Sequence, residues 1–359
     1  MTLFQKLQNN ISMPLHNYEI IRFKFTTPLH VGNERSDYST GGALLQSDAL
    51  YSAICHAWAR LGKAEWIPLE ENDHGAFTIS SLFPFVDYLN DTSYFLPKPM
   101  LLMDAKENET SIETSVRKAL KKVQWVDIPI FEALACSVPK QYSNTYFDKG
   151  YQTVKELPRD ELGKLIDPIS NKVMPRAAIS RNGADDTVIY YIERYYFHVQ
   201  AGLYAIVKFE NDEVKSRVVA ALRLLADEGI GTDRNIGHGK FNFSMGNLPF
   251  NFPEHSVYGI NVGMYCPTEK VEWANFSESD INDEARAGFT LVRRGGWMSE
   301  PYNTWRKRSV YMAQPGGVFK TEGISVAGKV VNVEPNAEGI DVGHKVWRNG
   351  RSIFLPCKG

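Results

Sequence analysis

Two amphipathic helical segments, each flanked by strand-like segments, constrain the fold of this chain most strongly. Residues 18–29 alternate apolar with basic side chains, which is typical of a half-buried strand. Residues 47–62 then carry apolar side chains at helical spacing, with Ser47 expected as the N-cap and Gly62 as the residue that ends the helix. This half of the chain therefore begins as a strand followed by a helix.

The same two patterns, a strand followed by a helix, return further along the chain. Two strands are predicted at 187–199 and 202–209, and apolar spacing predicts a helix over 212–228. A glycine-rich loop at 229–239 leads into one more strand. Strand, helix, strands, helix and strand is the order of a ferredoxin-like α+β sandwich, so we expect that architecture for residues 1–249.

The stretch from 138 to 183 departs from these patterns. It is polar, basic in places, and has no sustained period, which is typical of a functional insertion or a mobile loop. After residue 249 the chain is again rich in strand-like segments with few helical ones. We therefore expect a second, degenerate α+β domain over 250–359.

Composition narrows the class of protein further. The formal net charge is −2, so nucleic-acid binding would need a local basic face instead of a basic average. The four cysteines form no CxxC pair, which argues against a zinc ribbon and a disulfide framework. No segment approaches the roughly 20 apolar residues of a membrane span, and no signal peptide is evident. We expect a soluble, cytoplasmic protein that uses no cofactor or metal.

The glycine-rich loop is the first candidate binding site. Its glycines permit positive φ and close approach of backbone N–H groups to an anion, while its basic residues add charge. The structural alternative is a helix C-cap and a tight turn into the next strand. The spacing does not fit a Walker loop or GxGxxG. The candidate residues are Gly231, Thr232, Arg234, Asn235, Gly237, His238, Gly239 and Lys240, of which Arg234 and Lys240 are expected to contact phosphates.

Two further segments combine cations with aromatic or small apolar residues. Such combinations neutralise phosphates and stack on unpaired bases. One lies near the C-terminus and has a solvated charged hairpin as its alternative; its candidates are Arg293, Arg294, Trp297, Arg306 and Arg308. The other is KVMPRAAISR, which has a mobile surface loop as its alternative interpretation. Its candidates are Lys172, Arg176, Ile179 and Arg181, together with Arg194 from the aromatic strand that follows.

No catalytic constellation is evident. The sequence has no HExxH, no GxSxG and no paired carboxylates in a convincing context. His30, at the end of the first strand, is a possible acid or base for metal-independent RNA cleavage, but a polar residue at a strand end is the simpler interpretation. His238 is expected to hydrogen-bond RNA or backbone.

Together these segments resemble a known family. FTTPLHVG followed by SDALYSAICHAWARLG is similar to the start of RAMP-superfamily CRISPR proteins, and LLADEGIGTDRNIGHGKF is similar to their glycine-rich loop. LFPF, YFLPKPM and RGGWMS…RKRSVYMAQPGGVF narrow the resemblance to the subunit of the type III-A (Csm) interference complex that holds the 5′ handle of the guide RNA. The resemblance covers roughly residues 18–354.

The resemblance implies two ferredoxin-like (RRM-like) domains and a β-hairpin thumb within about 138–195. In such subunits the thumb inserts between bases of the crRNA 5′ handle, and the glycine loop touches the RNA backbone. Ile179 is the expected wedge, with Met174 or Val173 as alternatives. The implied partners are the crRNA, the large polymerase-like subunit, the backbone RAMP subunit and, indirectly, target RNA. The implied role is a non-catalytic scaffold; the alternative is a RAMP endoribonuclease that uses His30 or His238.

Overall fold

The computed structural model describes most of the chain as a mixed α+β fold. The described residues are 14–34, 37–41, 45–67, 77–101, 114–137, 145–179, 187–253, 256–269, 272, 288–298, 302–335 and 342–358. Arg181, expected in the RNA-facing set, lies outside them. No helix among the described residues has the length and apolar character needed to cross a membrane.

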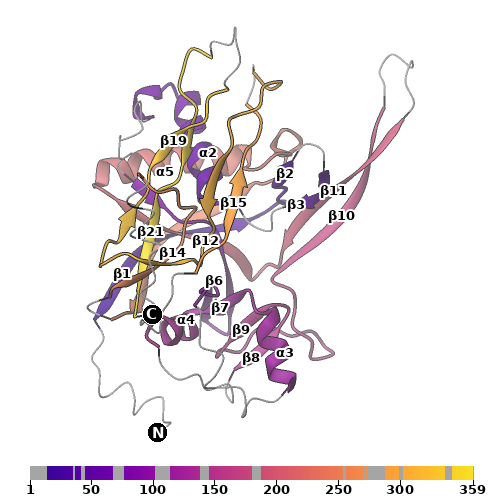
Figure 1. Cartoon of the computed structure of the whole chain (residues 1–359). Coiled ribbons are helices and arrows are strands. Elements are labelled where there is room, and N and C mark those ends of the chain that lie inside the picture. The colour runs from indigo at the N-terminus through magenta and orange to yellow at the C-terminus, as the bar shows by residue number, and fades with distance from the viewer. Residues whose placement is uncertain are drawn as a thin grey trace.

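A nine-stranded sheet forms the centre of the molecule (Figure 1). Its order is β13-β1-β12-β5-β6-β7-β9-β8, with β4 also paired to β12. All neighbours are antiparallel except β7 and β9. The strands are β1 (Leu15–Phe25), β4 (Phe77–Ile79), β5 (Phe83–Tyr88), β6 (Asp91–Pro97), β7 (Trp125–Asp127), β8 (Tyr146–Asp148), β9 (Tyr151–Thr153), β12 (Ala201–Phe209) and β13 (Phe241–Asn251).

Helices α2 (Ser47–Arg60) and α5 (Asp212–Glu228) share a hydrophobic core with one face of this sheet. The bounds of α5 are those predicted, and the Asn211 side chain caps it by accepting from the Val214 N–H. The expected cap of α2 was wrong. Gln46 is the N-cap, and the buried Ser47 hydroxyl instead accepts a hydrogen bond from the Met264 N–H at 2.8 Å.

The remaining described helical segments are short. They are α3 (Thr114–Lys122), α4 (Ile128–Ala135) and two 3-10 turns at Ala64–Trp66 and Arg234–Ile236. Within α4, Pro129 stands in the first turn, where a missing N–H costs no intrahelical bond. The Asp127 carboxylate accepts from the Ile130 N–H and caps the helix.

The C-terminal strands cover the second face of the central sheet. Ile20, Tyr204 and Ile206 of the sheet share one core with Ile260 and Leu355 from the C-terminal part. A four-stranded sheet of order β17-β14-β21-β18 supplies this layer. The C-terminal strands are β14 (Tyr258–Asn261), β15 (Leu291–Arg294), β16 (Val310–Ala313), β17 (Val318–Lys320), β18 (Val326–Ala327), β19 (Val330–Asn332), β20 (Trp347–Asn349) and β21 (Ser352–Cys357).

This second layer explains a difference from the sequence pattern. The alternation in β1 and β12 predicts strands with one buried face, yet Ile20 and Ile21 are both buried, as is nearly all of β12. A strand covered on both faces loses its polar side. The expected boundary at 249/250 falls inside β13, which continues to Asn251.

A two-stranded hairpin leaves the body of the molecule as a long arm (Figure 1). It consists of β10 (Ile169–Ala178) and β11 (Val188–Phe197), paired antiparallel over their full lengths. The residue pattern alone indicated an irregular, partly basic stretch here, whereas the resemblance implied a β-hairpin, and β10 does pair with β11 as a strand. A smaller hairpin of β2 (Gly32–Glu34) and β3 (Asp37–Gly41) lies against β11.

Candidate RNA interface

The hairpin of β10 and β11 has two chemically different faces. Residues paired directly across an antiparallel ladder lie on one face, and successive residues alternate between faces. Lys172 pairs with Arg194, and Arg176 lies four residue pairs further out on that same face. The opposite face carries Tyr191 and Ile189, which are 54% and 63% exposed. One face of the arm is therefore basic at its foot, while the other carries Glu193 at its foot and exposes apolar side chains further out.

The foot of the hairpin is fixed to the end of β1. Leu29 and Tyr195 exchange two backbone hydrogen bonds of 2.8 and 2.9 Å. This places His30 beside β11, where its Nδ1 lies 2.6 Å from the carbonyl oxygen of Glu193. Because a carbonyl only accepts, Nδ1 carries the proton and Nε2 is the ring atom left to meet a ligand. Only 2% of His30 is exposed.

The glycine-rich loop packs against this junction. A side chain on Gly231 would place its Cβ 2.4 Å from the His30 carbonyl oxygen, and one on Gly239 would meet Ile230 O at 1.9 Å. Both glycines also have positive φ. Thr232 donates its N–H to His30 O at 3.1 Å. Glycine is therefore required here for close packing of backbone on backbone.

The loop amides are largely used inside the protein. Gly237 N–H donates to Arg234 O, Gly239 N–H to Pro28 O, and Lys240 N–H to the Thr27 hydroxyl. The expectation that the N–H groups of Gly237 and Gly239 close around an RNA backbone therefore does not fit the structure. Gly229, with positive φ, ends α5 as the structural alternative predicted. What the loop presents outward is its side chains.

Those side chains meet the hairpin in a charged cluster. Arg194 Nη2 lies 3.4 Å from Asp233 Oδ2, and both side chains are mostly buried. The pKa of His238 is lowered by burial and by the charges of Arg194, Arg176 and His30, while Asp233 opposes the shift. Four cationic or potentially cationic side chains thus surround one carboxylate. We call these five residues the hairpin-foot cluster.

Other predicted loop residues lie apart from that cluster. The positive charge of Arg234 influences His56 of α2 instead. Burial and the charges of Arg234, Arg60 and Lys307 lower the pKa of His56. Asn235 and Lys240 are exposed, and Ile179, the expected wedge, is 73% exposed directly after β10. Lys172 reaches toward the Tyr196 ring at 5.5 Å.

The C-terminal candidates differ in how far the chain itself uses their guanidinium groups. The Arg306 guanidinium lies over the Trp297 ring at 5.4 Å, and Arg293 is exposed on β15. Arg308, by contrast, donates to the carbonyl oxygens of Glu334 and Asn332 at 2.9 and 2.8 Å. Arg294 donates two hydrogen bonds of 3.0 Å to the Asp48 carboxylate. The Arg294 guanidinium is therefore held by a buried carboxylate, whereas Arg308 has partners within the chain and remains exposed.

The carboxylate of Asp48 has a second partner that the sequence analysis missed. Arg348 donates to the same carboxylate and, at 2.7 Å, to the carbonyl of Gly295. Asp48 is fully buried, and despite the opposing effect of burial the two arginines hold its pKa below the usual range. We call Asp48, Arg294 and Arg348 the buried ion cluster. It joins α2 to the C-terminal strands.

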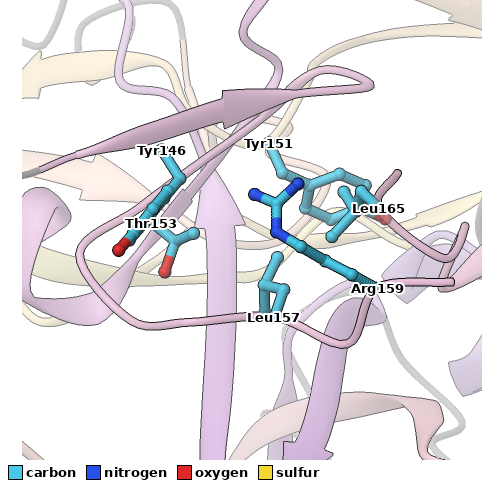
Figure 2. A pocket seen from close by; sticks show the side chains of 6 residues that line it. All are labelled: Tyr146, Tyr151, Thr153, Leu157, Arg159 and Leu165. Atoms are coloured by element: carbon cyan, nitrogen blue, oxygen red, sulfur yellow. The ribbon is translucent and has the colours of Figure 1, made fainter. Parts of the chain in front are cut away.

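A small cavity lies apart from these clusters, at the end of the central sheet formed by β8 and β9 (Figure 2). It has a volume of about 10 Å³ and is lined by Tyr146, Tyr151, Thr153, Leu157, Arg159 and Leu165. Such a volume admits about one water molecule. Over the described ranges, no three His, Cys, Asp or Glu side chains are grouped as a metal site.

Comparison with known proteins places this architecture in a family. A model described as "RAMP superfamily" matches residues 22–242, and one described as "CRISPR Csm4 C-terminal domain" matches 274–357. The "CRISPR system Cms protein Csm4" of Thermococcus onnurineus is 25% identical over 288 residues, covering 77% of this chain and 85% of that protein. The protein of the same description from Streptococcus thermophilus is 22% identical, covering 91% and 94%.

Solved structures share the fold at low sequence identity. A chain from the "Csm3-Csm4 subcomplex in the type III-A CRISPR-Cas interference complex" aligns with a TM-score of 0.60 and 18% identity, covering 94% of this chain and 99% of that one. A chain from the "Csm1-Csm4 cassette in complex with AMPPNP" aligns with a TM-score of 0.57 and 17% identity, covering 95% and 98%. Because the superfamily model spans more than half of the sequence and the C-terminal model most of the remainder, the chain belongs to the RAMP superfamily and carries a Csm4-type C-terminal domain.

Proposed function

We propose that this chain is a non-catalytic RNA-binding scaffold subunit of a type III-A CRISPR effector complex. In this role it caps the 5′ handle of the crRNA and bridges the large polymerase-like subunit to the backbone RAMP subunits in antiviral defence. The relatives described as Csm4, and the similar chains from Csm1–Csm4 and Csm3–Csm4 structures, support this assignment. Target RNA would be met indirectly, through its pairing with the guide.

The observation that carries the proposal is the hairpin-foot cluster. A projecting arm delivers Arg176 and Arg194 to a loop that adds His238, and Asp233 offsets part of their charge. Cations arranged along a groove neutralise the phosphates of single-stranded RNA. An exposed apolar residue near the end of β10, such as Ile179, suits the role of a wedge between bases. In this proposal the hairpin is the thumb.

We further propose that the N-terminal unit is ferredoxin-like. The strand order β13-β1-β12-β4, with α2 and α5 on one face, supports this assignment. For the C-terminal unit, the described residues offer a sheet but no helix of comparable length, so its ferredoxin-like character rests on the resemblance alone.

The test is charge reversal on the hairpin in the full chain. Arg176→Glu combined with Arg181→Glu should abolish retention of guide RNA when the complex is purified, because two phosphate contacts become repulsive. Lys121→Glu combined with Lys122→Glu on α3 changes the net charge equally, at exposed positions away from the hairpin, and should retain the RNA. Normal RNA retention in the hairpin variant would remove the proposed role of this face.

The second candidate is a RAMP endoribonuclease that processes precursor crRNA. His30 and His238 lie close enough for their charges to interact, as an acid–base pair would require. His30, however, is almost fully buried and holds its Nδ1 against a carbonyl, which favours a binding role. Incubation of the purified chain with repeat RNA without metal distinguishes the two: cleavage that disappears in a His30→Ala variant with an unchanged unfolding transition would establish the nuclease.

A further inference from the structure

Three side-chain nitrogens in the hairpin-foot cluster are buried without a hydrogen-bond partner among the described residues. They are His30 Nε2, Arg194 Nε and His238 Nδ1. A buried polar atom that loses water without gaining a partner costs free energy. Three of them at one junction of β1, β11 and the glycine-rich loop therefore mark a site that is completed by a ligand.

The chemistry of the ligand follows from the charges that face this junction. The charges of Arg176 of β10 and Arg194 of β11 both act on His238 of the loop, with Asp233 as the opposing acid. Glu193 also lies in β11, and its side chain accepts a hydrogen bond from Asn171. Cations outnumber the acids that face the three nitrogens, so an anion is the complementary ligand.

The orientation of His30 makes this site sensitive to protons. Its Nδ1–H donates to the Glu193 carbonyl oxygen, so in the neutral ring Nε2 bears a lone pair. A lone pair repels a phosphate oxygen, whereas the protonated ring offers Nε2–H as a donor. Protonation would likewise make both nitrogens of His238 donors.

We propose that His30, Arg194 and His238 together hold one phosphate group of a single-stranded RNA, and that the imidazoles take up protons as it binds. This inference rests on the proposed function, and it adds that RNA binding strengthens as the pH falls. In the free chain, burial and neighbouring cations keep the pKa of His238 low. A bound phosphate adds a negative charge and raises that pKa. Proton uptake therefore accompanies binding between the pKa values of the free and bound states.

The experiment measures affinity against pH at constant ionic strength. The full chain is titrated with single-stranded RNA of the host repeat from about pH 8 to about pH 6, where the phosphodiesters stay ionised. Affinity should rise by up to about tenfold per pH unit for each proton taken up. His238→Asn keeps a donor near the position of Nδ1 but cannot take up a proton, so it should flatten this dependence. His344→Asn, at an exposed histidine in the C-terminal part, should leave it unchanged.

A second arm avoids any change to the protein, because His30 is too buried to be replaced without a risk to folding. RNAs carrying a neutral methylphosphonate at one linkage at a time are bound to the unaltered chain. Neutralising the linkage held by the histidines should flatten the pH dependence, whereas the other linkages should lower affinity equally at every pH. Equal pH dependence in both histidine variants, or no linkage with this effect, overturns the inference alone. No RNA binding at any pH would instead remove the proposed function.

Discussion

The hairpin-foot cluster and the buried ion cluster contain similar residues in opposite circumstances. In the buried ion cluster, two arginines share one carboxylate that is fully buried, and both make direct hydrogen bonds to it. In the hairpin-foot cluster, Asp233 has one contact of 3.4 Å to Arg194, and three buried nitrogens have no partner among the described residues. The carboxylate of the first cluster is therefore paired with two arginines, and among the described residues this cluster leaves Arg348 Nε without a partner, whereas the second cluster leaves three nitrogens.

This difference separates basic residues that stabilise the fold from basic residues that are suited to bind RNA. Arg293 and Arg294 are neighbours on β15, yet only Arg294 reaches the buried carboxylate. A buried carboxylate with two guanidinium partners holds elements together, because loss of any member leaves an unpaired buried charge. Cations in excess over acids near a projecting arm are suited to a phosphate. The predictions below challenge this division, starting with the largest effect.

Removing the shared carboxylate should cause the greatest change. Asp48→Ala leaves Arg294 and Arg348 without their partner at the junction of α2 and the C-terminal strands. We expect the free energy of unfolding to fall by about 3–5 kcal/mol in urea titrations. Glu65→Ala, in an exposed pair with Lys63 at 3.6 Å, should change it by less than about 0.5 kcal/mol. A loss below about 1 kcal/mol at Asp48 would contradict the structural role of this cluster.

Replacing Lys307, which lies near the same cluster, should raise the free energy of unfolding instead of lowering it. Burial and the charge of Arg348 lower the pKa of Lys307 to about 8, although Asp48 opposes the shift. At neutral pH the folded chain therefore carries a charge that is disfavoured there. After allowance for partial exposure, Lys307→Met should raise the free energy of unfolding at neutral pH by up to about 2 kcal/mol.

The pH dependence of this effect follows from the depressed pKa. As pH rises from about 8 toward the usual pKa of lysine, the unfolded chain keeps a proton that the folded chain has lost. Stability of the unaltered chain should therefore rise over this range, and Lys307→Met should remove that rise. Lys345→Met, at an exposed lysine that pairs with Glu334 at 3.6 Å, is the matched control and should keep it.

Local sequence patterns were sufficient to predict those elements that are determined by residues close together in the sequence. The spacing of apolar residues predicted α5 with its observed bounds, and Gly62 follows α2 with positive φ as expected. The burial of Tyr204 and Ile206 was not predictable in this way. Their cover comes from Ile260 and Leu355, and no local period records a contact so distant in the chain.

The candidate site shows the same limit. Basic and aromatic residues pointed to candidate segments, but did not indicate which arginine has an internal partner. Arg294 meets Asp48 across 246 positions of sequence, and His30 meets Glu193 across 163. Arg348, missed by the sequence analysis, lies between Lys345 and Arg351 in KVWRNGR, and nothing in that segment marks it as the partner of Asp48. Partners of this kind are set by tertiary packing, so only the structure separates the two groups.

The exposed end of the hairpin should contribute to RNA binding without contributing to stability. Ile179→Gly should weaken binding by about 1–3 kcal/mol, the range for one stacking contact, with an unchanged unfolding transition. Leu162→Gly, at a residue 80% exposed outside the hairpin, should alter neither quantity. A larger loss in Val173→Gly or Met174→Gly, measured with the same RNA, would move the wedge inward along β10.

The two neighbouring arginines of β15 give the smallest and most selective test. Arg293 is exposed, so Arg293→Gln should reduce the slope of log affinity against log salt by about one unit and leave stability within about 0.5 kcal/mol. Arg294→Gln should do the reverse, because its guanidinium is held by Asp48: the salt slope should stay the same while the free energy of unfolding falls. RNA titrations at several salt concentrations, paired with urea titrations of both variants, measure the four quantities. If both variants changed the same quantity, completeness of internal pairing would not separate structural from RNA-binding arginines in this molecule.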